Sequence, residues 1–304
     1  MKIILIAGCG DIAMRVAALL RGHYRLFGLA RRTERHAGLR AAGITPLPGD
    51  LDNFASIARI AGLADIVLHF APPASTSAMT GKDHDGFTVD HRTRNLLATL
   101  SRGTPPKRLI YISTSGVYGD CGGAQVSETH PLHPQSARAQ LRADAERQIR
   151  DWARRNHANT GILRVPGIYA ADRLPLERLR ANTPAIVHAE DSYTNHIHAD
   201  DLARIVVAAL RYAKPNRIYH ASDDSAMKMG DYFDVVADAH GLPHPPRLPC
   251  SEVERGVSPA LWSFMKESRR LTNARMKREM KVTLRYPTVA DALASLMKTS
   301  GNAP

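Results

Sequence analysis

The sequence predicts an α/β protein, with a doubly wound parallel sheet and a smaller C-terminal lobe. Three observations support this fold. Residues 2–13, KIILIAGCGDIA, have the pattern of a buried strand, a glycine-spaced turn and the start of a helix. Apolar runs typical of strands then alternate with helical patterns, as in sheets built from right-handed crossovers. Polar residues follow the ends of these runs, where ligands bind to such sheets.

The first turn matches a phosphate-binding pattern. Gly8, Gly10 and Ala13 fit G-x-G-x-x-G/A, in which the glycines allow a tight turn and close approach of a pyrophosphate, and the small third residue lets the helix pack on the strand. A diphosphate would accept hydrogen bonds from free N–H groups at the helix start, which includes Asp11 and Ile12. We therefore expect dinucleotide binding here rather than an ordinary strand-to-helix turn.

The elements that follow repeat the same unit. The next four strands are predicted at residues 24–30, 44–47, 65–70 and 108–112. Helical patterns separate them at residues 33–42, 54–60 and about 86–101. Later, a helix is expected from about residue 200 to 210 and a strand at residues 217–220. We expect a Rossmann-type domain over residues 1–165, to which residues 195–222 return, and a smaller substrate-binding lobe over residues 166–304.

The end of the second strand indicates which dinucleotide is bound. An acidic residue there would bind the ribose 2′-hydroxyl of NAD, whereas this chain has Ala30, Arg31 and Arg32. Because guanidinium groups bind phosphate through charge-assisted hydrogen bonds, NADP is preferred and NAD is the alternative. Either arginine could instead only solvate a helix start. Asp50, after the third strand, is expected to contact the adenine or to cap the helix that follows Asn53.

Composition restricts the function classes. The chain has 304 residues, 44% of them hydrophobic, with a formal net charge of +12. Its arginines are spread over many predicted helices, and no basic run is interleaved with aromatic residues, which favours an anionic cofactor and substrate over nucleic acid. No segment has the length of a transmembrane helix, and the three cysteines form no CxxC pair. We expect a cytoplasmic protein with no membrane partner, no metal and no disulfide framework.

Several short motifs occur in a family's order over nearly the whole chain: VLHFA at 67–71, TRNLL at 93–97, YISTSGVYGD at 111–120, LRVPGIYA at 163–170, NHIHADDLA at 195–203 and YHASDD at 219–224. On these motifs the chain resembles the extended short-chain dehydrogenase/reductase superfamily, the NAD(P)-dependent epimerases and dehydratases. The resemblance implies oxidoreductase, epimerase or dehydratase chemistry on a small, sugar-nucleotide- or phosphate-like anion. It also implies cofactor contacts at Leu51, Phe70, Ala71, Pro72, Ser113, Arg142, Pro166 and Ile168.

The family's catalytic segments are partly retained. Its catalytic Ser/Thr falls on Thr114, whose hydroxyl would bond a substrate oxygen, although it could instead cap its own backbone. The family's Tyr-x-x-x-Lys pair is replaced by Arg138 and Arg142, four residues apart on one helix face. Arginine stays protonated and cannot be the general acid/base. Arg142 would still hold the nicotinamide ribose, or the pair would clamp a phosphate or carboxylate. The resemblance is therefore to an atypical subgroup.

Other residues could supply the missing proton transfer or bind a ligand. Tyr118 is the next candidate for proton transfer, although the tyrosine of this motif is usually structural. His196, His198 and Asp201 have a metal-like spacing, but the same letters match the turn into a packing helix. His133 and Tyr193 are candidates by chemistry alone. In the basic segment 267–280, expected to be a helix, Arg269 or Arg270 either faces the cleft or belongs to a solvated face.

Two function classes remain open. The first is an NADP-dependent oxidoreductase, epimerase or dehydratase in which Thr114 orients the substrate. The second is a cofactor-binding protein without turnover, such as a sensor in which NADP(H) favours one arrangement of the lobes. The replaced pair at Arg138 and Arg142 favours the second class, and the retained Thr114 and two-lobed frame favour the first. A homodimer is also open.

Overall fold

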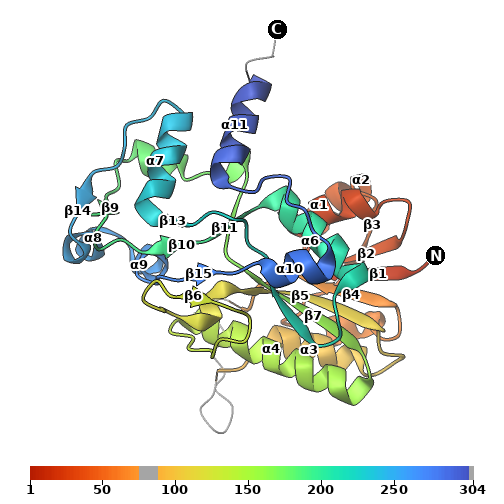
Figure 1. Ribbon diagram of the computed structural model, residues 1–304. Coiled ribbons are helices and arrows are strands. Elements are labelled where there is room, and N and C mark those ends of the chain that lie inside the picture. The colour runs from red at the N-terminus through yellow and green to blue at the C-terminus, as the bar shows by residue number, and fades with distance from the viewer. Residues whose placement is uncertain (75–87, 301–304) are drawn as a thin grey trace.

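The structure is a computed structural model that describes residues 1–74 and 88–300. Its centre is a parallel sheet in the order β12-β7-β5-β4-β1-β2-β3 (Figure 1). The strands are β1 (Ile3–Ala7), β2 (Arg25–Ala30), β3 (Ile44–Pro48), β4 (Ile66–His69), β5 (Arg108–Thr114), β7 (Asn159–Val165) and β12 (Arg217–His220). The strand order reverses at β1, so the predicted doubly wound Rossmann-type fold is confirmed.

Helices cover both faces of this sheet (Figure 1). One face is covered by α1 (Asp11–Leu20), α2 (His36–Ala41), α6 (Ala199–Tyr212) and α10 (Ala274–Met280). The other is covered by α3 (His91–Leu100), α4 (Ala137–Asn156) and the 3₁₀ segment η2 (Phe54–Ile60). Each layer buries its own apolar cluster against the sheet, so every strand of the centre is apolar on both faces, as its sequence predicts.

Element boundaries differ from the prediction in several places. The segment 54–60 is a 3₁₀ helix, and Asn53 rather than Asp50 caps it, through a 3.4 Å bond from the Ser56 N–H to Asn53 Oδ1. The segment 33–42 divides into a 3₁₀ turn, η1 (Thr33–Arg35), and α2. Helix α3 begins at His91, while residues 86 and 87 of the predicted helix lie outside the described residues. Strand β5 continues to Thr114.

The C-terminal lobe has its own apolar cluster, which includes Tyr169, Phe233, Val236 and Val289. Its helices are η4 (Ala171–Arg173), α5 (Leu176–Arg180), α7 (Met229–Ala239), α8 (Cys250–Gly256), α9 (Pro259–Met265) and α11 (Val289–Ser300). Short strands pair as β8 (Gly167–Tyr169) with β11 (His196–His198), β9 (Ala185–Ile186) with β14 (Arg247–Leu248), β10 (Tyr193–Thr194) with β13 (Met227–Lys228), and β6 (Gln125–Val126) with β15 (Arg270–Leu271).

The chain returns from this lobe to the sheet twice. The first return carries α6, which packs on α1, and β12, which pairs with β7. The second is in the basic segment near the C-terminus, where Met276 and Met280 enter the main core. The prediction of one helix there is wrong, since Arg270–Leu271 is a strand and the helix begins at Ala274. In the described part of the chain, no helix combines the length and apolarity needed to cross a membrane.

Candidate functional site

Two cavities lie side by side at the carboxyl ends of the parallel strands. The first, of about 550 Å³, is formed by the ends of β1, β2 and β4 and the start of α1. The second, of about 740 Å³, lies between the ends of β5 and β7, the start of α4 and the C-terminal lobe. Among the described residues, four line both cavities, namely Ile112, Arg142, Ile168 and Arg173. The two cavities therefore meet along one boundary.

The two glycines of the first turn have different roles. Gly8 has φ +104°, and a Cβ built on it would lie 2.3 Å from the Ala71 nitrogen, so the fold itself requires glycine there. Gly10 has φ −86° and ψ −164°, which any residue adopts, and a Cβ on it meets no described atom within 4 Å. It is the N-cap of α1 and, as a glycine, has no side chain with which to cap the helix. The space beside Gly10 therefore fits a diphosphate on the free N–H groups of the helix start.

Most of the predicted cofactor residues line the first cavity. These are Gly8, Gly10, Asp11, Ile12, Ala13, Arg31, Arg32, Asp50, Leu51, Phe70, Ala71, Pro72, Arg142 and Ile168. Ser113 and Pro166 instead line the second cavity, since Ser113 lies near the end of β5 and Pro166 directly follows β7, the two strands whose ends form that cavity. The residues that the sequence reasoning missed include three arginines, Arg35, Arg92 and Arg173.

Four arginines that line the first cavity differ in how firmly they are held. Arg92 donates two hydrogen bonds to the carboxylate of Asp52, at 2.7 and 2.6 Å, and this bonding lowers the pKa of Asp52. Arg35 donates from Nη2 to the Cys9 carbonyl at 3.0 Å. Arg31 is exposed, and its Nη1 lies 3.9 Å from Asp52 Oδ2. Arg32 is also exposed. Arg35 lies three residues after Arg32 on η1, a helical spacing that could have pointed to it.

The second cavity brings together the predicted catalytic residues Thr114, Arg138 and Arg142. Thr114 Oγ1 accepts a 3.2 Å bond from the Gly116 N–H, so this hydroxyl does cap its own backbone. That bond uses a lone pair and leaves the hydroxyl proton available to a substrate oxygen. Arg142 Nη1 donates to the Ile112 carbonyl at 2.7 Å and to the Tyr111 hydroxyl at 3.0 Å, which fixes the guanidinium at the boundary of the cavities.

The second cavity is strongly positive. Its described lining includes four arginines and one carboxylate, Glu267, which accepts a 2.8 Å bond from Arg269 Nη1. Arg138 has no described carboxylate within ion-pair distance, and its guanidinium lies 4.4 Å from the ring centroid of Phe264. Desolvation and then repulsion from Arg142 lower the pKa of Arg138, against the attraction of Glu267. A cavity with this excess of fixed positive charge attracts anions.

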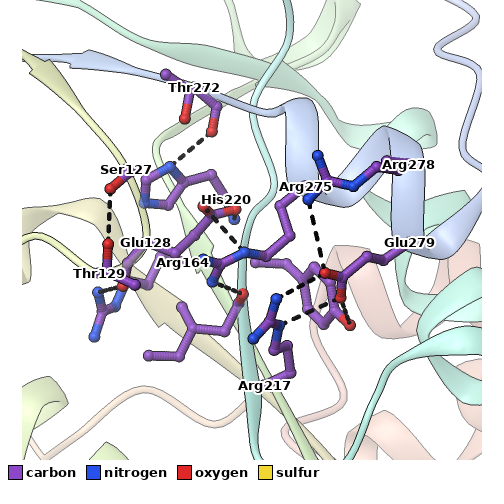
Figure 2. Close-up of polar contacts among 12 residues, drawn as sticks. Ser127, Glu128, Thr129, Arg164, Arg217, His220, Thr272, Arg275, Arg278 and Glu279 are labelled. Carbon is purple, nitrogen blue, oxygen red and sulfur yellow. Dashed lines mark hydrogen bonds and ion pairs between the residues drawn. The ribbon is translucent and has the colours of Figure 1, made fainter.

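Tyr118 lies outside both cavities, so its candidacy for proton transfer has no support in the geometry. Its buried hydroxyl is within 2.6 Å of both Arg164 Nη1 and His220 Nε2. Burial raises the pKa of Tyr118 to about 12 and lowers that of His220 to about 3. Figure 2 shows the surroundings of this network, in which His220 also bonds the Thr272 carbonyl at 2.9 Å. Tyr118, the last residue of the 3₁₀ segment η3 (Ser115–Tyr118) that follows β5, therefore links this segment to β7 and β12.

The buried network continues toward the second cavity. Arg164 donates to both carboxylate oxygens of Glu146, at 3.1 and 2.7 Å, and Ser113 donates to Glu146 Oε1 at 2.6 Å. Glu146 is buried on α4, four residues after Arg142. This chain of bonds links α4 to the ends of β5 and β7, and it holds the cavity wall that carries Ser113 and Thr114 in place.

The other chemical candidates have different roles. His198 Nδ1 caps α6 through the Asp200 N–H at 3.2 Å, while Asp201 accepts 2.8 Å bonds from the N–H groups of Arg285 and Tyr286. His196 lines the second cavity and stacks on Tyr232, with its pKa lowered to about 3 by burial. The described residues contain no group of three His, Cys, Asp or Glu side chains that could hold a metal ion.

The remaining sequence candidates divide between the cavity and the surface. Tyr193 and Arg269 line the second cavity. Arg270 is exposed and donates to the Gly123 carbonyl at 2.8 Å, and its guanidinium lies 4.9 Å from the ring centroid of Tyr193. His133 is exposed and lines neither cavity. Of the two arginines in question, Arg269 is therefore the one that faces the cleft.

A family model described as the NAD dependent epimerase/dehydratase family matches residues 4–221. The chain belongs to this family. The match covers the Rossmann sheet, both glycines of the first turn and the wall of the second cavity that carries Thr114 and Arg142. The predicted resemblance is thus confirmed at the level of the family.

Individual relatives are distant. Human dTDP-D-glucose 4,6-dehydratase is 23% identical over 173 residues, which are 54% of this chain and 49% of that protein, so the chain spans about half the length of this curated relative. A functionally unknown conserved protein from Silicibacter pomeroyi is 27% identical, with a TM-score of 0.76 over 99% of both chains. UDP-glucuronic acid 4-epimerase from Bacillus cereus, solved with NAD, is 17% identical, with a TM-score of 0.73 over 98% of this chain and 99% of that one, and shows the fold alone.

Proposed function

We propose that this protein is an NADP-preferring oxidoreductase, epimerase or dehydratase that acts on a small anionic substrate, of the sugar-nucleotide or phosphate type. The observation that carries the proposal is the boundary between the cavities. The cavity beside Gly10 meets a second, strongly positive cavity at Arg142, and Thr114 and Arg138 also line this second cavity. A dinucleotide whose diphosphate lies on α1 has room to extend toward that boundary. When bound, it supplies a nicotinamide ring that accepts or donates hydride.

The residues of the second cavity have distinct proposed roles. The Thr114 hydroxyl donates to a substrate oxygen, since its acceptor side is occupied by the Gly116 N–H. Arg142, held by Ile112 and Tyr111, lies where the ribose of a nicotinamide nucleotide or a substrate oxygen would reach it. Arg138 binds the anionic part of the substrate. Tyr193 lines this cavity while Tyr118 does not, so Tyr193 becomes the first candidate for the proton that Arg138 cannot supply.

The proposed preference for NADP rests on the lining of the first cavity at the end of β2. Ala30 stands where an acidic residue would bind a 2′-hydroxyl, and three arginines, Arg31, Arg32 and Arg35, line the same region. Arg31 and Arg32 are exposed, so both can turn toward a phosphate at little cost in existing bonds. Arg35 is already oriented by the Cys9 carbonyl.

A second candidate function is a binding protein without turnover. The replacement of a tyrosine and a lysine by Arg138 and Arg142 favours it, because neither guanidinium exchanges a proton near neutral pH. Both functions share the dinucleotide and the anion site, and they differ only in whether the second cavity catalyses a reaction.

Thermal unfolding of the NADP-bound protein tests the anion site. Inorganic phosphate and small carboxylates should raise the melting temperature, because a ligand at a hundred times its Kd stabilises the folded state by about 2.7 kcal/mol. The Arg138→Ala variant should lose most of this shift. Arg155→Ala, an exposed arginine at the far end of the same helix, is the matched control and should retain it. An equal loss in both variants would mean that the shift is an unspecific salt effect.

Turnover separates the two candidate functions. Turnover is followed as conversion of the sugar-nucleotide substrate to product, by chromatography, because an epimerase or dehydratase returns NADP(H) to its starting state. Conversion by the unmodified protein that is lost in Thr114→Val and Tyr193→Phe would establish an enzyme. Absence of turnover in the unmodified protein, with carbonyl reduction gained in the Arg138→Tyr, Arg142→Lys double variant, would establish a binding protein whose catalytic pair was replaced. Turnover that survives Arg138→Ala unchanged would remove Arg138 from the site.

A further inference from the structure

Arg173 occupies a position that neither the sequence motifs nor the proposed function explains. It is the last residue of η4, in the segment that leads from the sheet into the C-terminal lobe, and it lines both cavities. Its Nη1 lies 3.4 Å from Asp11 Oδ2, and both side chains are more than a third exposed. An exposed ion pair at this distance is weak, so Arg173 can leave Asp11 easily.

Asp11 itself lies in the first turn of α1, beside the N–H groups proposed to hold the diphosphate. An unpaired carboxylate there would repel the diphosphate. Arg15 compensates for it, since its Nε lies 3.0 and 3.1 Å from the two carboxylate oxygens of Asp11. Arg15 is fixed on its other side by Asp200. Asp11 thus keeps a permanent partner on its own helix, and it does not need Arg173.

We propose that Arg173 is a clamp that leaves Asp11 and binds the phosphate oxygens of a dinucleotide seated on α1. The inference rests on the proposed dinucleotide binding. A guanidinium gains more from a charge-assisted bond to a phosphate oxygen than from an exposed pair with a carboxylate that is already neutralised. Because η4 belongs to the segment that enters the C-terminal lobe, the clamp links the bound cofactor to the wall shared by the two cavities.

Calorimetry with fragments of the dinucleotide tests the clamp. Arg173→Ala should raise the Kd for ADP-ribose, which contains the diphosphate but no nicotinamide, by about tenfold. This is the effect expected from the loss of one charge-assisted hydrogen bond. The same variant should raise the Kd for NADP by the same factor. The Kd for adenosine 2′-phosphate, which has no diphosphate, should be unchanged. Arg180→Ala is the matched control, because Arg180 is an exposed arginine of the same lobe that lines neither cavity.

The Asp11→Asn variant gives an independent readout. It removes a negative charge beside the diphosphate and also frees Arg173, so ADP-ribose should bind more tightly. The gain should be smaller when Arg173→Ala is already present, because only the removal of charge then remains. Equal gains in the two backgrounds would show that Asp11 does not hold Arg173 back.

The outcomes separate the clamp from the proposed function. If the unmodified protein binds neither ADP-ribose nor NADP, the proposed function fails. If it binds both and Arg173→Ala binds them equally well, the clamp alone is refuted. If Arg173→Ala keeps dinucleotide affinity but loses the stabilisation of the NADP-bound protein by inorganic phosphate, Arg173 serves the substrate anion, and the diphosphate clamp is wrong.

Discussion

Gly8 and Gly10 offer a paired test in which one substitution damages the fold and the other damages only ligand binding. A Cβ on Gly8 would lie 2.3 Å from the Ala71 nitrogen and 2.6 Å from the Phe70 carbonyl carbon, and its φ of +104° is unfavourable for any side chain. Backbone strain and overpacking together should cost Gly8→Ala roughly 2 to 6 kcal/mol of unfolding free energy. Chemical denaturation measures this loss directly.

Gly10→Val should behave in the opposite way. The φ of −86° and ψ of −164° at Gly10 suit valine, and a Cβ there meets no described atom within 4 Å. A glycine N-cap with no side-chain bond has little to lose, so the unfolding free energy should change by about 1 kcal/mol or less. The new side chain would fill the space beside the first N–H groups of α1. Losing two charge-assisted bonds to a diphosphate should weaken both NADPH and NADH by about a hundredfold or more.

The two variants are compared by denaturation without ligand and by calorimetric titration with NADPH and NADH. A Gly10→Val protein that is as stable as the unmodified chain and binds both dinucleotides normally would refute the assignment of this turn to the diphosphate. A Gly8→Ala protein with unchanged stability would refute the account of the close contact with Ala71.

Further predictions concern single side chains. Replacing Arg31 and Arg32 with alanine should weaken the binding of NADPH by about tenfold or more and leave the binding of NADH unchanged. Equal affinities for the two dinucleotides in the unmodified protein would contradict the proposed preference for NADP. Tyr118→Phe should lower the unfolding free energy by roughly 1 to 3 kcal/mol, because Arg164 and His220 lose a buried partner, with NADPH affinity unchanged in the same titration. Burial raises the pKa of Asp223 from 3.8 to about 7. The folded state therefore holds this proton over a range in which the unfolded chain has released it, so the contribution of Asp223 to stability is lost as pH rises from about 4 to 7. Raising the pH from 5 to 7 should therefore lower the unfolding free energy of the unmodified protein by roughly 2 to 3 kcal/mol more than that of Asp223→Asn. The same pH dependence of unfolding free energy in both proteins would disprove the raised pKa of Asp223.

Local patterns in the sequence were sufficient for most of the sheet. Apolar runs and glycine turns predict β1 to β5 because a strand buried on both faces needs them, and the helical spacing of Arg138 and Arg142 predicts that both side chains meet in one cavity. The two-residue strands of the C-terminal lobe were missed, since pairs such as Arg270–Leu271 owe their conformation to a partner 145 residues earlier at Gln125 and Val126.

The site shows the same division. Gly8, Gly10 and Arg31 follow from position in a motif, whereas Arg173 enters both cavities only because η4 folds back over α1, 162 residues away in sequence from Asp11. Tyr118 has a hydroxyl that could transfer a proton, but this hydroxyl is buried against Arg164 and His220, which lie 46 and 102 residues further along the chain. Contacts at such separations leave no signal in a local pattern.

A crystal structure of the protein with NADP⁺ and sulfate would show whether one dinucleotide joins the two cavities. We expect a diphosphate on the N–H groups that follow Gly10, a nicotinamide ring at the boundary marked by Ile112 and Arg142, and a sulfate ion on Arg138 in the second cavity. A dinucleotide bound elsewhere, or one whose nicotinamide turns away from Thr114 and Arg142, would contradict it.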